Sequence, residues 1–426
     1  MGEPAPTPVL LANGVRTICH PARDAHSVAL GLWVQAGTLD ETPAEHGIAH
    51  LLEHMAFKST TTRSTRDISI AVEAVGASLD AATSHQRTAY YVRCLPGDAE
   101  ALCEILGDIL LNPALIAAEL ETEQDVVIQE IGEAADEPDD DLFETLASLA
   151  WGDENLGSPI LGTPGSVKAQ TPESLRAFMA RTYGGKNIVF STAGAITPTE
   201  TERLASTYFS GFADAPPGAP RAQPHWHGGA RAIHRDLQQS HLATAFPGYG
   251  YCEEQFVAAR LFAEILGGGS ASRLFQSVRE DRGLAYSVYA YADVFDQTGL
   301  IGFYLGTDQD RAGEALRLAM DEVRALADKV ENDELDRAKA MARAGLLMAQ
   351  ENHAAKAEGA AQSLHIFGRV RPAREILDQI MTVTPKDVAQ IACMVCETNQ
   401  PALCTVGPLE KGWTQAAAGT LVEVAV

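Results

Sequence analysis

The chain has 426 residues, enough for about two to four domains of ordinary size. Apolar residues make up 46% and charged residues 21%, which excludes a disordered, collagen-like or disulfide-stapled chain, and no apolar run approaches a membrane span of roughly 18 residues. Acidic residues outnumber basic ones by 57 to 32, and this net charge of −25 disfavours nucleic acid and favours basic ligands.

The N-terminal residues and the cysteines bear on the compartment. The opening run, MGEPAPTPVL, lacks a basic region, a long apolar region and a small-residue cleavage site, so we expect no export signal. The seven cysteines are odd in number and scattered, which is typical of packed thiols in a reducing environment. The sequence therefore predicts a cytoplasmic location without membrane attachment.

The N-terminal half alternates between strand and helix patterns. Runs at 28–37 and 88–95 predict strands, and apolar residues at helical spacing predict a helix at 98–110. Between the two strands, EHGIAHLLEHMAFKS at 45–59 predicts a helix, with Thr42-Pro43 as its start. This helix carries the most informative motif of the chain.

The motif is H-x-x-E-H. His50 and His54 lie four residues apart, so a helix places both imidazoles on one face, where they can bind one metal ion. Glu53 projects from the same side and can act as a general base on a water at that metal. This order of residues is a signature of zinc peptidases.

A catalytic zinc ion normally takes a third protein ligand. The best candidate is Glu130, in a long helix predicted at 114–149, because its apolar neighbours turn it towards the core. Glu123 lies nearly two helical turns earlier on the same face, so one carboxylate suits the metal and the other can support it from behind.

Plainer interpretations of these residues compete. His46 precedes His50 by one turn and would extend the two histidines to a stripe of three. The segment 119–144 contains twelve carboxylates and no Lys or Arg, so Glu123 and Glu130 can also be members of a solvated acidic face.

The order of features repeats along the chain. Thr88 and Thr298 each belong to a strand-like run before a long helix, and Thr171 and Thr384 each open a helix with a Thr-Pro pair. The offsets between the members of these pairs are 210 and 213 residues. The chain is therefore expected to contain two copies of one unit.

A Pro/Gly-rich stretch at 213–228 separates the copies. We predict domains at 1–212 and 229–426, each α+β, with a largely antiparallel sheet covered on one face by helices, including a long one at 332–360. Shifting the motif helix by the repeat offset gives residues 251–270, which contain no histidine, so only the first domain is expected to bind metal.

The chain resembles the pitrilysin or insulinase-like zinc metallopeptidases, which include the mitochondrial processing peptidase. The resemblance rests on GIAHLLEHMAFKST, GASLDAATSHQRTAYYV and GGGSASRLFQSVREDRGLAYSVYAY, and it covers nearly the whole chain. In that family a glutamate ligand follows the inverted motif after about 75 residues. Here 75 residues lie between His54 and Glu130.

The resemblance implies roles for individual residues. It makes His50, His54 and Glu130 the ligands of one Zn²⁺ per chain, Glu53 the base and Glu123 a supporting carboxylate. It places an Arg and a Tyr seven residues apart in the second half at the substrate, and Arg279 and Tyr286 match that spacing. It also implies an edge strand at 77–83 that binds the substrate main chain through Leu79, Asp80, Ala81 and Ala82.

Asp80 departs from the family, where Asn is usual. Its charge, like that of the whole chain, favours basic peptides as substrates. We expect a zinc endopeptidase that encloses peptides in a chamber and forms a homodimer. The alternatives are a non-catalytic peptide-binding or assembly subunit, or one subunit of a heterodimeric processing peptidase.

Overall fold

The computed structural model describes residues 6–152, 155–215, 221 and 224–422. The chain divides into two compact units, and each unit takes segments from both halves of the sequence. Unit 1 comprises Met1–Gly132, Pro159–Ala222 and Leu346–Ala373, and unit 2 comprises Glu133–Ser158, Gln223–Gly345 and Arg374–Val426.

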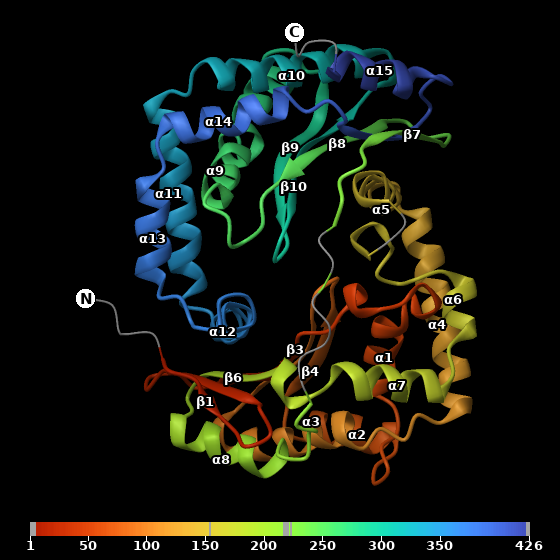
Figure 1. Ribbon diagram of the computed structural model, residues 1–426, viewed down its shortest axis with the longest axis vertical. Helices are drawn as coiled ribbons and strands as arrows, with labels where there is room; N and C mark the ends of the chain where they lie inside the picture. Colours follow the sequence, from red (N-terminus) through yellow and green to blue (C-terminus); the bar gives the residue numbers. More distant parts are fainter. Residues whose placement is uncertain (1–5, 153–154, 216–220, 222–223, 423–426) are drawn as a thin grey trace. The chain divides into compact units, whose positions relative to one another are not determined.

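Unit 1 is built on a six-stranded sheet with the order β1-β2-β6-β3-β5-β4 (Figure 1). Neighbouring strands are antiparallel except β2 and β6, which are parallel. The strands are β1 (Val9–Leu10), β2 (Arg16–Pro21), β3 (Val28–Val34), β4 (Ser78–Thr83), β5 (Thr88–Cys94) and β6 (Ile188–Gly194).

The five-stranded sheet of unit 2 repeats the unit 1 sheet without a counterpart of β1. Its order is β7-β11-β8-β10-β9, again with one parallel pair, β7 and β11, beside antiparallel neighbours. The strands are β7 (Gly229–His234), β8 (Ser240–Gly248), β9 (Ala285–Val294), β10 (Gly299–Thr307) and β11 (Ala402–Gly407). The shared order and directions of these five strands and of β2-β6-β3-β5-β4 in unit 1 confirm the α+β fold and the predicted duplication.

Helices follow the same repeat. Thr171 and Thr384 accept hydrogen bonds from the third residue of the helices that they open, which confirms both predicted Thr-Pro starts. The helices of unit 1 are α1 (Ile48–Ala56), α2 (Thr65–Ala74), α3 (Ala99–Leu111), α4 (Ala117–Asp136), α6 (Pro164–Ala169), α7 (Pro172–Thr182), α8 (Pro198–Tyr208) and α12 (His353–Phe367). Those of unit 2 are α5 (Pro138–Trp151), α9 (Phe256–Gly267), α10 (Ala312–Asp328), α11 (Asn332–Ala349), α13 (Ala373–Thr382), α14 (Pro385–Cys396) and α15 (Trp413–Val422).

The prediction of continuous helices at 114–149 and 332–360 was wrong, because each stretch forms two helices. Pro138 is the first residue of α5 and ends the preceding helix, since its ring cannot continue a helical turn. Asn352 caps α12 by accepting hydrogen bonds from the backbone of Ala354 and Ala355. After each break the chain enters the opposite unit, so α5 packs on β8 and β11 while α12 packs on β3 and β6.

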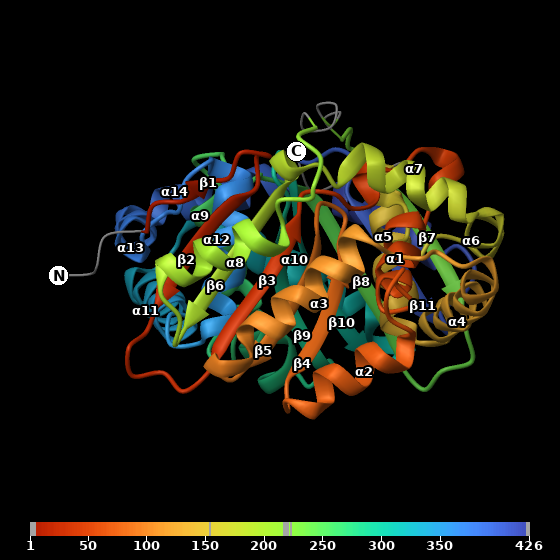
Figure 2. The ribbon, with the colours of Figure 1, turned by 90° about the horizontal axis from the view of Figure 1, so that it is seen from below.

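The prediction that helices cover one face of the sheet was wrong for unit 1. Because of α12, this sheet is covered on both faces. Leu30, Leu32 and Val34 of β3 face the larger core, whereas Trp33 faces α12. Figure 2 shows α12 beside β2 and β6. The second core combines Ile18, Trp33, Val189 and Ala193 of the sheet with Ala357, Ala360, Ala361 and Leu364 of α12.

The compact units take segments from both halves of the chain, so they do not test the domain limits 1–212 and 229–426. Those limits stay a prediction. Of the predicted linker 213–228, residues 216–220 and 222–223 lie outside the described residues. None of the helices in the described part of the chain has the length and apolar character needed to cross a bilayer. The cytoplasmic location stays a prediction.

Helix α1 begins later than predicted. Thr42-Pro43 opens a short 3-10 turn, Pro43–Glu45, and α1 starts only at Ile48, after Gly47 has adopted a left-handed conformation with φ of 85°. Glycine is required at 47, because a Cβ there would lie 2.6 Å from the carbonyl oxygen of Leu161. The helix start predicted from the local Thr-Pro pair was wrong, because the observed start depends on the long-range contact between Gly47 and Leu161.

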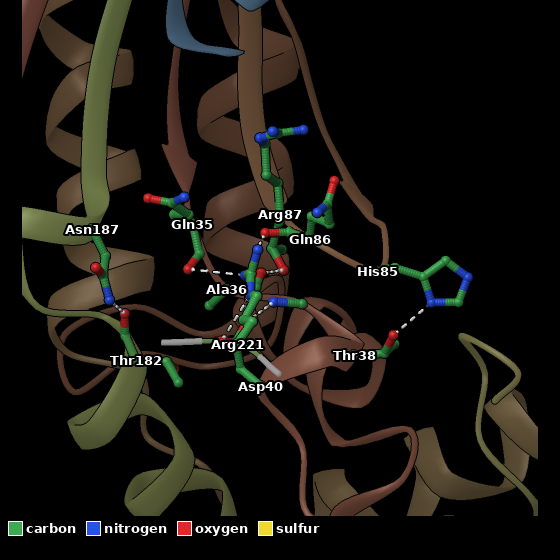
Figure 3. Close-up of polar contacts among 12 residues, drawn as sticks. Gln35, Ala36, Thr38, Asp40, His85, Gln86, Arg87, Thr182, Asn187 and Arg221 are labelled. Atoms are coloured by element: carbon green, nitrogen blue, oxygen red, sulfur yellow. Dashed lines mark hydrogen bonds and ion pairs between the residues drawn. The ribbon is translucent and has the colours of Figure 1, made fainter. Parts of the chain in front are cut away.

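The loop before α1 is anchored by polar contacts (Figure 3). Arg221 donates to Asp40 Oδ2 at 2.6 Å and to the carbonyl oxygen of Gln86 at 2.8 Å, and Thr38 Oγ1 lies 2.7 Å from His85 Nδ1. These bonds hold both ends of the short 3-10 turn Thr38–Asp40. They also fix the position of the next residue, Glu41.

Glu41 caps the N-terminus of α1. Its two carboxyl oxygens accept hydrogen bonds from the backbone of Gly47 at 3.0 Å and Ala49 at 2.9 Å. Burial raises the pKa of this carboxyl to about 8, against the opposing effect of the two hydrogen bonds; the nearby Glu45 and Asp40 add to the rise.

We expect Leu364→Ala to lower the free energy of unfolding by about 2–5 kcal/mol, because Leu364 is fully buried under the sheet of unit 1. Leu347→Ala is the control, since Leu347 is 42% exposed. Denaturant titration measures both. Equal effects would contradict the packing of α12.

The raised pKa of Glu41 predicts a pH-dependent stability. Between the ordinary value of 4.5 and about 8, the folded carboxyl keeps a proton that the unfolded one loses, so this group lowers stability as pH rises. Glu41→Gln loses one backbone acceptor but has no such dependence. We therefore expect its cost in melting temperature to be larger at pH 5.5 than at pH 8.

This comparison uses protein stripped of metal, so that metal binding does not contribute to the pH dependence. Glu121→Gln, an exposed change on α4, serves as the control. A cost of Glu41→Gln that grows with pH would show that the carboxyl is ionised in the folded protein.

Candidate metal centre

Helices α1 and α4 bring the three predicted ligands together. His50 Nε2 lies 3.9 Å and His54 Nε2 3.5 Å from Glu130 Oε2. Each of these three residues offers one potential ligand atom, and the three atoms lie within 4.8 Å of one another. Among the described residues, no other group of three or more His, Cys, Asp or Glu side chains converges in this way. His46 precedes α1 and is not part of this group, so no stripe of three histidines forms.

The apolar residues of α1 determine which way its histidines point. Ile48, Leu51, Leu52 and Met55 are buried in the core of unit 1, which leaves His50, Glu53 and His54 on the half-buried side of the helix. On α4, buried Val127 faces the same core, so the acidic run is not simply a solvated face. Glu130 remains partly exposed and Glu123 is buried.

Glu123 supports the site by contacting the ring nitrogen of His54 that is not directed at Glu130. Its Oε2 lies 3.2 Å from His54 Nδ1, and its Oε1 lies 2.6 Å from Lys58 Nζ. The ammonium of Lys58 can only donate, which makes Glu123 the acceptor in these contacts and assigns His54 the tautomer with its proton on Nδ1. The lone pair of His54 is therefore on Nε2, the nitrogen nearer to Glu130.

Glu53 is held by a residue that the sequence interpretation missed. Thr83, the last residue of β4, donates a hydrogen bond to Glu53 Oε2. Burial raises the pKa of Glu53, and Asp80 and Glu130 also raise it, against the lowering effect of Thr83 and His54. A raised pKa suits a group that accepts and returns a proton near neutral pH.

The donor set fits zinc. Burial, with a smaller contribution from His54, lowers the pKa of His50 to about 4, so this imidazole is neutral at pH 7 and offers a lone pair. Two neutral imidazoles and one carboxylate are the donors that catalytic zinc sites use, with one position left for water. His50 Nδ1 is buried without a hydrogen-bond partner among the described residues.

The predicted substrate strand is β4, at the edge of the sheet of unit 1. Leu79 and Ala81 pack against the core, whereas Asp80 and Ala82 are exposed on the opposite face. Tyr91 donates a hydrogen bond of 3.4 Å to Asp80. With two side chains turned inward, this strand is suited to contact a peptide mainly through its backbone.

Arg279 and Tyr286 lie in unit 2 and contact each other. Arg279 lies in a π-helical turn, Phe275–Glu280, and its guanidinium lies 4.5 Å from the ring centre of Phe275 and 5.4 Å from that of Tyr286. Tyr286 is 75% exposed. The sequence analysis did not identify Phe275 as a partner of Arg279.

The second copy keeps the helix but not the ligands. In the order of the repeat, α9 takes the place of α1, and its sequence FVAARLFAEILG contains no histidine. Most of its residues are buried as apolar core.

Comparison with known proteins gives the family of both halves. Residues 16–164 match the family described as "Insulinase (Peptidase family M16)", and residues 170–342 match "Peptidase M16 inactive domain". An "Uncharacterized zinc protease" of Rickettsia bellii is 33% identical over 93% of this chain and 96% of its own length. The "Uncharacterized zinc protease YmxG" of Bacillus subtilis is 30% identical over 93% of this chain and 97% of its own length.

Solved structures share the fold. A protease from Helicobacter pylori superposes with a TM-score of 0.88 at 19% identity, covering 95% of this chain and 100% of that one. A protein from Pseudomonas fluorescens described as a peptidase M16 inactive domain gives 0.85 at 20% identity, covering 95% and 98%. The family matches and these full-length relatives show that the chain belongs to the insulinase-like peptidase family M16.

Proposed function

We propose that this chain is a zinc-dependent endopeptidase that binds one Zn²⁺ through His50, His54 and Glu130. The observation that carries the proposal is the convergence of these ligand atoms within 4.8 Å, beside a glutamate held by a neighbouring strand. The names of the relatives, zinc proteases, support it.

When bound, zinc would polarise the scissile carbonyl and lower the pKa of a water molecule to about 7. Glu53 would take a proton from that water on Oε1, because Oε2 is engaged by Thr83. The same carboxyl would then return the proton to the leaving amine. Thr83 keeps Glu53 from rotating between these two steps.

We propose that peptides bind along the free edge of β4, in extended form. Main-chain hydrogen bonds to an edge strand give affinity with little dependence on sequence. The exposed carboxylate of Asp80 and the net charge of −25 favour basic peptides. Arg279 and Tyr286 are proposed to orient the peptide and to donate hydrogen bonds to the scissile carbonyl oxygen.

The enclosed chamber and the homodimer rest on the family resemblance alone and stay predictions. Cleavage of a mixed peptide library, with and without a chelator, tests the proposed function directly. Cleavage that the chelator abolishes supports a zinc endopeptidase. Peptide binding without cleavage would favour the alternative, a non-catalytic subunit or one chain of a heterodimer.

We expect Glu53→Gln to keep its zinc and to lower peptide cleavage by about 10²–10⁴-fold, because the general base is lost while all three ligands remain. Elemental analysis and the peptide assay measure the two effects. Glu73→Gln, on the exposed face of α2, is the matched control. Unchanged turnover in purified Glu53→Gln would remove Glu53 from the mechanism.

We expect Glu130→Ala to lose its zinc, because two imidazoles alone hold the ion weakly. Elemental analysis after dialysis measures the zinc content per chain. Glu121→Ala removes an exposed carboxylate from the same helix and should leave the content unchanged. Full occupancy in Glu130→Ala would mean that another residue is the third ligand.

A further inference from the structure

Lys58 contacts the proposed zinc site through an intermediate carboxylate. It follows α1 by two residues, in a turn where the backbone of Phe57 and of Lys58 donates to the carbonyl oxygens of His54 and Met55. From this turn the lysine side chain reaches Glu123 on α4. Its ammonium lies 2.6 Å from Glu123 Oε1, and the side chain is 26% exposed.

The carboxylate of Glu123 has one oxygen for each of two partners. Oε1 meets Lys58 and Oε2 meets Nδ1 of His54, so the lysine and the histidine hold the group from both ends. Glu123 is only 6% exposed, so water contributes little to its solvation. A buried carboxylate is stabilised by a cation at hydrogen-bond distance, and without one it would tend to move towards solvent.

A second contact fixes the same turn. Ser59, the residue after Lys58, donates hydrogen bonds from its backbone nitrogen and its hydroxyl to Glu119. Glu119 and Glu123 are one helical turn apart on α4, so adjacent carboxylates of one helix bind adjacent residues of one turn. The lysine is therefore presented to Glu123 from a backbone that cannot shift freely.

We propose that Lys58 is a positioning residue that acts through Glu123 to orient His54, and thereby strengthens zinc binding. This inference rests on the proposed zinc site. The lysine supplies the charge that keeps Glu123 in place, and Glu123 in turn holds the proton of His54 on Nδ1 and its lone pair on Nε2. Partners of this kind, one step removed from a metal, typically change metal affinity about 10–100-fold.

The test is the affinity for Zn²⁺, measured by competition with a chromogenic chelator. We expect Lys58→Met to bind Zn²⁺ about ten-fold more weakly than the wild type, and Lys58→Arg to stay within about three-fold, because a guanidinium can reach the same carboxylate. Lys168→Met is the matched control. Lys168 also contacts an acidic residue of α4, Asp125, at 2.6 Å, but both side chains are largely exposed.

A double-mutant cycle separates this role from a merely structural one. In a Glu123→Gln background, Lys58→Met should change Zn²⁺ affinity by less than about two-fold, because the intermediate has already been removed. An equal loss in both backgrounds, an unchanged affinity of Lys58→Met, or an Arg variant as weak as the Met variant would each overturn the inference. Melting temperatures of the zinc-free variants show whether they are folded.

Failure of the inference differs from failure of the proposed function. A wild-type protein that does not bind Zn²⁺ would overturn both. A wild type that binds Zn²⁺ and cleaves peptides, with Lys58→Met indistinguishable from it, would overturn the role of Lys58 alone.

Discussion

The contact between α1 and α4 is the constraint on which the candidate site depends. The two histidines and Glu130 come from helices that lie far apart in the sequence, so a ligand set exists only where these helices meet at a fixed distance. Buried Glu123 joins them from the α4 side through His54 and Lys58. Apolar packing brings the helices together, and the polar contacts determine which atoms face each other.

The candidate site could be predicted from the sequence where spacing within one helix decides the outcome. The separation of His50 and His54, and that of Glu123 and Glu130, translates directly into faces of a helix. Thr83 and Lys58 could not be assigned in this way, because their partners are 30 and 65 residues away and no local pattern marks such pairs. The arrangement of Phe275 beside Arg279 depends on a π-helical turn, which has no simple sequence signal.

The same distinction applies to the fold. Repeated Thr-Pro starts and strand runs were sufficient to predict a duplication, and five strands of each sheet follow the same order. Helix limits were less accessible, because the late start of α1 depends on a close approach between Gly47 and Leu161. The path of the chain between units could not be predicted at all, since breaks at Pro138 and Asn352 say where a helix ends but not which sheet the next one joins.

Duplication has left the two copies with different chemistry on one framework. The first copy retains imidazoles and carboxylates on the helices beside its sheet, whereas the corresponding helix of the second, α9, has become apolar. Arg279 and Tyr286 are displayed instead from the turn and strand that follow it. A fold of this kind tolerates such divergence because the sheet and its core do not depend on the side chains that carry function.

The passage of α12 into unit 1 has a consequence for how the protein is made. During translation, β6 leaves the ribosome about 160 residues before α12, which at about 5–20 residues per second is a delay of roughly ten to thirty seconds. Through that interval Ile18, Trp33 and Val189 have no helix to cover them. The apolar outer face of this sheet therefore stays open to aggregation until the last fifth of the chain is synthesised.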